Sequence, residues 1–257
     1  MEKTIANPDP AKVISRASEC LRRLMEAGLS FEDLQKPIDN PEMRQRLVRF
    51  WQTGAPIPFI QYSSSNALSD LFDRQIKTLR DRGCPSQVLD MLISQKSQVL
   101  FRASVMTFKK GRIPFLPVIL FSVLSPSAQM AMVRNGNQTG ISCLDTNEIK
   151  DIVSTPVQPY FIFDVEDGEG MLGRSVRTAT ELIKDMNRSP LTAAEVISLG
   201  IQAKALSKRY VDAGGSRYKS DRCAPFLCLD GGQPGLGWNC VDSSFSECGS
   251  ASCGSRS

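Results

Sequence analysis

The chain has 257 residues, of which 41% are hydrophobic and 23% charged, and its formal net charge is +4. Such a chain can bury a full hydrophobic core, and so small a charge does not identify a partner. The chain contains no histidine, which excludes a Ser-His-Asp triad, a Cys-His pair, an H-E-x-x-H zinc site and a histidine general base.

The N-terminus and the apolar segments show no sign of export or membrane insertion. Residues 1–9 lack the apolar stretch of a signal peptide, and no apolar run approaches the ~20 residues of a membrane span. Eight cysteines in a chain of this size, with no export signal, favour reduced thiols over a disulfide framework. We therefore expect a soluble, cytoplasmic protein that needs no cofactor and no membrane.

Residues 1–55 predict a small helical module with periodic apolar positions. Pro10 suits the first turn of one helix, and Asn40-Pro41 opens another. The apolar face of these helices needs a partner, which is either the main domain or another protein. Residues 56–66 contain the prolines and serines of a linker.

Residues 67–257 predict one α+β domain, which opens with a pair of antiparallel helices over 67–82 and about 85–103. Basic residues outnumber acidic ones between Asp70 and Arg112, which could suit a phosphate-rich partner. Aromatic residues are not interleaved with them, so we favour a solvated helix surface and do not expect nucleic-acid binding.

Strands follow Gly111. We expect them over five segments: 113–123, 129–134, 139–144, 160–165 and 171–174. Asn135-Gly136 favours the tight turn of a hairpin, and residues 146–153 suit a short helix.

Two capping boxes then predict two helices, one at Thr178 with Glu181 and one at Thr192 with Glu195. The last expected elements are a strand over 225–229, a loop over 231–237, a strand over 238–241 and a tail of small residues from 247. This order predicts a mixed or mostly antiparallel sheet flanked by helices, with the small N-terminal helical module in front of it.

Seven segments, in this order, carry a resemblance to a known family: FDRQIKTLRDRG, GRIPFLPVI, QMAMVR, YFIFDVEDGEG, RSPLTAAEVISL, LGWNC and GSASCGSR. From about residue 68 to its end, the chain resembles an uncharacterised bacterial family catalogued as domain of unknown function 5701. Family members carry a second aromatic after the Gly-Trp pair and an aromatic-rich stretch before GSASC. Here these places hold Asn239-Cys240 and residues 244–247, and the resemblance implies no reaction.

The C-terminal cysteines raise the question of a metal site. Zinc is held by thiolates that are usually paired closely in sequence, as in C-x2-C. The spacings here are wider, and a cysteine within an apolar strand behaves as a small hydrophobe. We therefore favour ordinary thiols over a metal site at the four candidates, Cys223, Cys228, Cys240 and Cys248.

The segment Gly249–Gly254 is the best candidate for a functional site. Small residues allow backbone N–H groups to converge on an anion, and such dipoles would lower the pKa of an accessible Cys253 thiol. Asp164, at a predicted strand end, could be its acid or base. The alternative is an edge segment that packs closely under Trp238. The expected binding residues are Gly237, Trp238, Gly249, Ser250 and Ser252.

The sequence thus leaves two functions open. The first is a cytoplasmic domain that binds a ligand or a protein. The alternative is a histidine-free, thiol-dependent enzyme or redox protein that uses Cys253.

Overall fold

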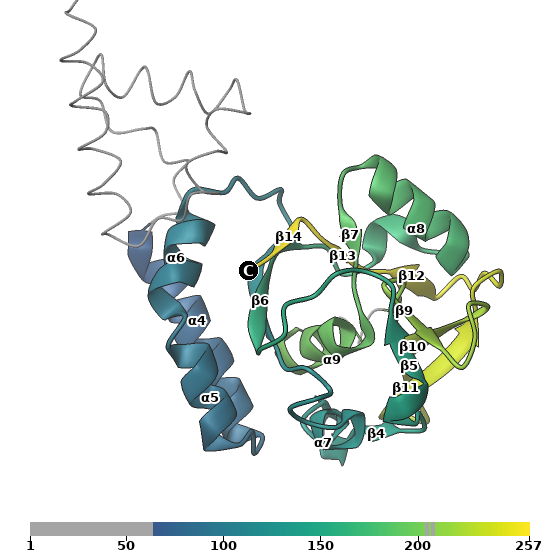
Figure 1. Ribbon diagram of the computed structural model, residues 1–257, viewed down its shortest axis with the longest axis horizontal. Helices are drawn as coiled ribbons and strands as arrows, with labels where there is room; N and C mark the ends of the chain where they lie inside the picture. Colours follow the sequence, from purple (N-terminus) through teal and green to yellow (C-terminus); the bar gives the residue numbers. More distant parts are fainter. Residues whose placement is uncertain (1–63, 204–205, 207–208) are drawn as a thin grey trace, which may run out of the picture. The chain divides into compact units, whose positions relative to one another are not determined.

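The computed structural model describes residues 64–203, 206 and 209–257, drawn in colour in Figure 1. The chain divides into two compact units, Met1–Phe59 and Ile60–Ser257, and the described residues belong to the second. The predicted helical module lies outside them. No helix among the described residues is long and apolar enough to cross a membrane.

Three helices open the described unit: α4 (Ser64–Asp81), α5 (Ser86–Ile93) and α6 (Lys96–Ser104). The predicted helix over 85–103 is wrong in one respect, because it is interrupted at Ser94 and Gln95. The side-chain amide of Gln95 donates a hydrogen bond to the carbonyl of Pro159 at 2.7 Å, so the interruption contacts a loop distant in sequence. Helix α4 also begins within the predicted linker.

A three-stranded antiparallel sheet packs against these helices, in the order β1-β6-β14. Its strands are β1 (Ile113–Val118), β6 (Tyr160–Val165) and β14 (Ser255–Arg256). Phe72 of α4 stacks on Phe161, with ring centroids 5.4 Å apart. The predicted strand over 160–165 is confirmed, whereas the one over 113–123 ends at Val118.

A second sheet has five strands in the order β12-β8-β10-β11-β4. These strands are β4 (Ile141–Ser142), β8 (Tyr210–Asp212), β10 (Cys223–Asp230), β11 (Gln233–Cys240) and β12 (Cys248–Ser250). The predicted loop over 231–237 is wrong, because β10 and β11 form a hairpin that turns at Gly231 and Gly232. Both have positive φ, 54° and 88°, as such tight turns require. Strands β4 and β12 join in parallel, so the sheet is mixed.

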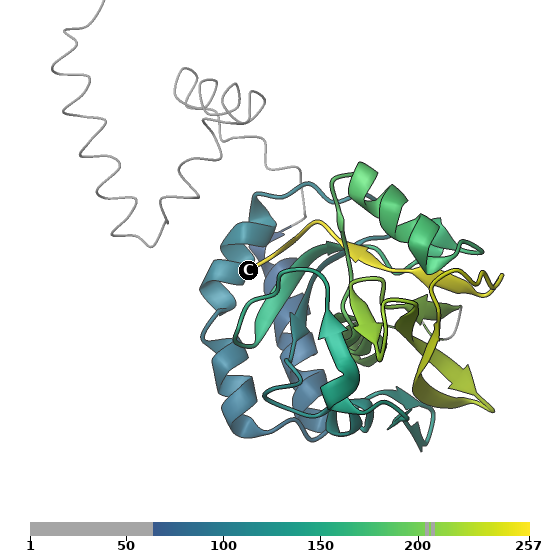
Figure 2. The ribbon, with the colours of Figure 1, turned by 45° about the vertical axis from the view of Figure 1, so that its right-hand side comes forward.

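Helix α9 (Ala193–Gln202) is the centre of the unit, as Figures 1 and 2 show. It contacts β1, β10 and α4, and all its residues but the last are buried. The capping box of Thr192 with Glu195 is confirmed at its start. A Cβ on Gly200 would lie 2.5 Å from a methyl group of Leu227, so a larger residue would force that side chain to move.

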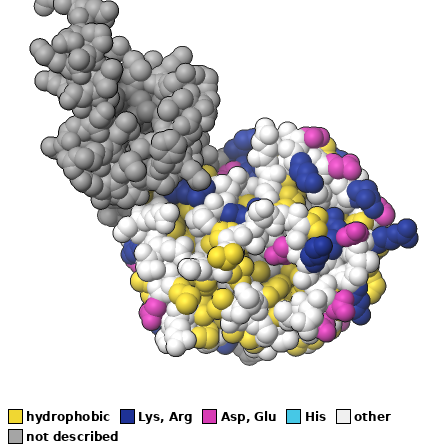
Figure 3. Space-filling model, viewed as in Figure 1, with side chains coloured by type: hydrophobic (Ala, Val, Ile, Leu, Met, Phe, Trp, Pro, Cys, Tyr) yellow, Lys and Arg dark blue, Asp and Glu magenta, His cyan; other side chains and the backbone are white. Residues whose placement is uncertain are grey.

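The other predicted capping box is wrong. Helix α8 (Val176–Asp185) begins after Ser175, whose hydroxyl accepts from the backbone of Thr178. Helix α8 covers β7 (Ser189–Pro190) and β12. Figure 3 shows charged side chains mostly on the side of α8 and hydrophobic ones at the centre of the same face.

Four short segments also differ from the prediction. Ser125 caps a helix, α7 (Pro126–Met130), where a strand was expected, and Pro126 occupies its first turn. The hairpin at Gly136 is present but short. The expected strand over 171–174 does not form, because Met171 ends a 3-10 helix and a turn follows it. The expected helix over 146–153 is wrong too, because η1 (Thr146–Glu148), a 3-10 helix, is followed there by the strand β5 (Ile149–Asp151). The remaining short elements are β2 (Arg134–Asn135), β3 (Gln138–Thr139), η2 (Glu169–Met171), β9 (Ser216–Tyr218) and β13 (Ser252–Cys253).

Candidate functional site

The small-residue tail folds back against both sheets. Strand β12 pairs with β8, β13 pairs with β7, and β14 pairs with β6. The prediction that the tail lies against the strand of Tyr160 is therefore confirmed. Strands β12 and β14 each form the edge of a larger sheet, and β13 forms a two-stranded sheet with β7, so backbone hydrogen bonds hold the tail along its length.

Cys253 is fully buried in this arrangement. Desolvation, followed by the charge of Glu195, raises the pKa of its thiol to about 12. The expected accessible thiol with a lowered pKa is wrong. The neighbouring backbone amides do not converge on an anion, because the Ser252 amide donates to Glu166 and the Gly254 amide to Phe163.

Asp164 lies beside the tail, and a Cβ on Gly254 would be 3.2 Å from its side chain. Its carboxylate accepts from Arg112 at 2.5 Å and also from Arg188. Arg188 further donates to the hydroxyl of Ser252 at 2.9 Å. Asp164 therefore holds two arginines together, and one of them, Arg188, also contacts β13.

Gly249 and Ser250 are buried within β12. A Cβ on Gly249 would overlap the carbonyl oxygen of Gly168, so close backbone packing explains the glycine. The Ser250 hydroxyl has no hydrogen-bond partner in the described part of the chain. Its strand neighbour is Asp212, which is buried, and desolvation raises the pKa of Asp212 to about 6.

Trp238 and Gly237 lie on β11, and two strands, β10 and β8, separate β11 from β12. The Trp238 side chain is 51% exposed, and its ring faces Tyr218 with a centroid distance of 6.3 Å. A Cβ on Gly237 would lie 3.2 Å from the ring of Phe226. The structure therefore does not bring Trp238 together with Asp164 and Cys253.

The four cysteines considered for a metal are separated into two groups. Cys223 and Cys240 are opposite each other in the β10–β11 register. The Cys228 thiol donates to the carbonyl of Gly235, and Cys248 is buried with its pKa raised by desolvation to about 12. Across residues 64–203, 206 and 209–257, no three metal-binding side chains lie together.

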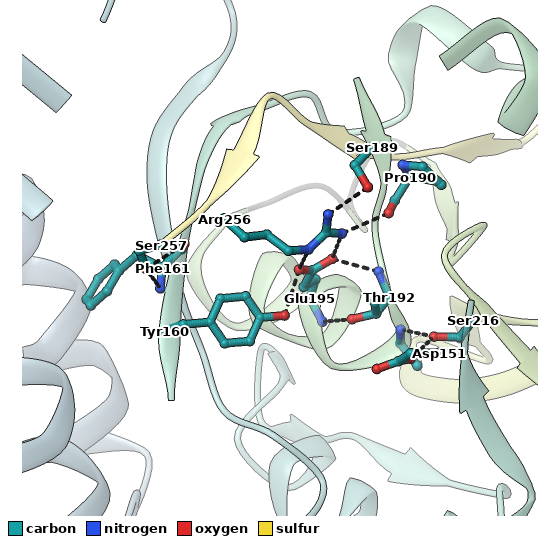
Figure 4. A network of polar contacts seen from close by, with 11 residues as sticks. Asp151, Tyr160, Phe161, Ser189, Pro190, Thr192, Glu195, Ser216, Arg256 and Ser257 are labelled. Carbon is teal, nitrogen blue, oxygen red and sulfur yellow. Dashed lines mark hydrogen bonds and ion pairs between the residues drawn. The ribbon is translucent and has the colours of Figure 1, made fainter. Parts of the chain in front are cut away.

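A buried polar network lies where the tail meets α9, and Figure 4 shows its members pointing toward one another. Glu195 has no exposed surface. Its carboxylate accepts from Tyr160 at 2.7 Å, from the Thr192 amide at 2.7 Å and from Arg256 at 2.6 and 2.8 Å. Arg256 also donates to the Ser189 hydroxyl at 2.6 Å. The network joins β6, β7, α9 and β14.

A cavity of about 190 Å³ adjoins this network. Its inner wall is buried and its mouth exposed. The lining residues come from the loop after β1, from η1 and β5, from β6 and from the start of α9: Leu120, Phe121, Ser122, Thr146, Ile149, Asp151, Tyr160, Thr192 and Ala194.

Asp151 supplies the charge of this cavity. The Ser216 hydroxyl donates to its carboxylate at 2.5 Å and accepts from the Ala193 amide at 2.9 Å, which orients the carboxylate. Desolvation of the carboxyl group, and then the charge of Glu195, raise the pKa of Asp151 although the Ser216 hydrogen bond opposes this. Counted by formal charge, the carboxylates of Glu195 and Asp151 face one guanidinium, that of Arg256, so the cluster has a formal net charge of −1.

Only one local feature of the sequence points to this site. The capping box identified Glu195, but as a helix cap and not as the centre of a network. Arg256 ends the segment GSASCGSR, which predicted no role for it, and Asp151 stands in none of the quoted segments. Their partners are 61 and 65 residues away in the chain. These contacts form only when the chain folds, so the sequence does not predict them.

The burial of Cys253 leads to a labelling prediction. When the native protein is treated with iodoacetamide at mildly alkaline pH, we expect the exposed Cys143 to be alkylated and Cys253 to stay unmodified until the protein is unfolded. Peptide mass spectrometry of native and urea-treated samples measures this. Alkylation of native Cys253 at a rate close to that of Cys143 would contradict the buried position.

The comparisons with known proteins give the family. The model of a family of unknown function, DUF5701, matches residues 75–257, which is well over half of the chain. Searches of curated proteins and of solved structures returned no match. The order of the seven segments quoted in the sequence analysis predicts this family, and the chain belongs to it.

Proposed function

We propose that this domain binds a small cationic ligand, such as a primary ammonium compound, in the cavity beside Tyr160. The observation that supports this is the unbalanced charge of the Asp151, Glu195 and Arg256 cluster. Arg256 is already committed to Glu195 by two hydrogen bonds. A bound monocation would neutralise Asp151, which lies exposed at the mouth of the cavity and is therefore open to a ligand.

The shape and lining of the cavity agree with such a ligand. Its volume of about 190 Å³ is slightly larger than the ~150 Å³ cavity known to hold benzene. The rings of Phe121 and Tyr160 in its wall suit an ammonium group through cation–π contact. The hydroxyls of Ser122 and Thr146 offer hydrogen-bond acceptors.

We also propose that the ligand is bound in the cytoplasm. The seven described cysteines are all free thiols, as a reducing compartment favours. The thiol-dependent alternative has lost its main support, because Cys253 is buried and its pKa is raised. Binding, and not thiol chemistry, is the function that the arrangement favours.

The test is a titration of the purified full chain with benzylammonium, with neutral benzyl alcohol as the matched probe. We expect benzylammonium to raise the melting temperature of the wild type, since a ligand that binds only the native state stabilises it. Asp151→Asn keeps the acceptor for Ser216 but removes the charge, so we expect it to lose this stabilisation. Asp90→Asn, on the exposed side of α5, is the charge-matched control.

A second variant tests the place of binding. Ala194→Val narrows the buried wall of the cavity without changing any charge, and we expect it to weaken binding as well. Equal stabilisation of the wild type and of Asp151→Asn would overturn the proposal. So would the absence of any response to benzylammonium at millimolar concentration.

A further inference from the structure

A second cavity, of about 480 Å³, lies at the other end of α9. It is enclosed by the end of α4, the β2–β3 hairpin and the end of α9. The lining residues include Thr78, Arg82, Arg134, Gly136, Ile201 and Leu206. Its volume is within the ~300–1,000 Å³ range of small-molecule sites. It shares no lining residue with the cavity beside Tyr160.

Two arginines line this cavity without an acidic partner. In the part of the chain that the structure describes, neither Arg82 nor Arg134 forms an ion pair with a carboxylate. Arg82 is half-buried, and desolvation together with the nearby charge of Arg134 lowers the pKa of its guanidinium. Among the described residues, the two positive charges thus have no carboxylate that neutralises them.

Helix dipoles account for part of this positive charge. Helices α4 and α9 both end at the cavity, and each helix C-terminus carries roughly −0.5 of an elementary charge. Together they contribute about −1 against the +2 of the two arginines. About one positive charge stays unbalanced in the cavity, so dipole capping does not explain the second arginine.

From this charge and this lining, we infer that the cavity binds a small oxyanion, a phosphate or a carboxylate, that carries a short apolar group. A guanidinium presents five N–H donors in a planar fork that matches either oxyanion. The Arg82 fork is oriented by one donor, Nη1, which binds the carbonyl of Met132 at 2.8 Å. The remaining N–H donors of the Arg82 guanidinium would bind the ligand. Ile201 and Leu206 are buried apolar residues of the wall and would contact the apolar group.

Calorimetric titration of the full chain with phenyl phosphate and with benzoate tests this site, and neutral benzyl alcohol serves as the matched probe. We expect one or both oxyanions to bind, with lower affinity at high salt because the contact is electrostatic. We expect Arg134→Gln to bind at least about tenfold more weakly, since a charge-assisted hydrogen bond is lost. Arg134 is exposed, so this variant should fold.

Two further variants make the result specific. Arg82→Lys keeps the charge but not the planar fork, so we expect weaker binding of the same probe. Arg174→Gln removes an exposed arginine beside α8 and should leave the affinity unchanged. The relative response to phenyl phosphate and benzoate distinguishes a phosphate from a carboxylate ligand. The inference is overturned if Arg134→Gln binds as tightly as the wild type, or if neither oxyanion binds at millimolar concentration.

Discussion

Replacing Arg256 with methionine is expected to lower the free energy of unfolding by about 3–5 kcal/mol. Methionine retains much of the length of the side chain but leaves the Glu195 carboxylate, which is 0% exposed, without its charge partner. A buried charge that loses its partner is strongly destabilising. Urea denaturation of the wild type and the variant at neutral pH measures the difference.

The matched control is Arg177→Met. Arg177 forms the same type of pair with Asp242, but both side chains are exposed to solvent, and exposed pairs contribute little to stability. The double variant Arg256→Met with Glu195→Gln should recover part of the loss, because the buried charge is then removed. If Arg256→Met costs no more stability than Arg177→Met, the network beside Tyr160 does not hold the tail in place.

Replacing Asp212 with asparagine is expected to remove a pH-dependent loss of stability. Burial raises the pKa of Asp212 from 3.8 to about 6. Between these values the unfolded chain releases its proton while the folded protein retains it, so stability falls as the pH rises. The shift of about 2 pKa units corresponds to a loss of roughly 3 kcal/mol, complete above the folded-state pKa.

The measurement is the free energy of unfolding of the wild type and of Asp212→Asn at a series of pH values from acidic to neutral. The difference between the two proteins should shift in favour of the variant as the pH passes from about 4 to above 6. The asparagine amide could also change the free energy of unfolding by an amount that does not depend on pH, and such a change does not affect this trend. Asp230→Asn, at the exposed end of β10, should give a flat difference, and a flat difference for Asp212→Asn would show that its carboxylate is not desolvated.

Elements whose signals are local were predicted well from the sequence. The strand Tyr160–Val165 is an unbroken apolar run, and the capping box of Thr192 with Glu195 lies within one turn of chain. The errors arose where two local signals compete. Gln129 and Met130 suit a strand, but Ser125 and Pro126 before them start a helix instead.

Strand β11 shows a different source of error. Its glycines, Gly235 and Gly237, have low strand propensity, and the segment therefore resembles a loop in the sequence. Its partner β10 supplies the hydrogen bonds of a full antiparallel register, from Cys223 with Cys240 to Asp230 with Gln233. Pairing overrides propensity here, because strand propensity depends strongly on the neighbouring strand.

The site itself was only partly accessible from the sequence. The tail was expected to fold back, and it does so, but the expectation for Cys253 depended on an exposed thiol. Three added strand pairings bury it instead. Burial depends on every element that packs around a residue, and no short stretch of sequence contains that information.

The order of residues is sufficient to establish the family, the α+β class and the absence of any histidine chemistry, since each follows from composition or from patterns within short segments. The contact of Arg256 with Glu195, and the two cavities of opposite charge at the ends of α9, exist only in the folded chain. The physical reason is that net local charge and desolvation are sums over residues that are far apart in sequence. Such sums are defined only when the backbone has brought those residues together.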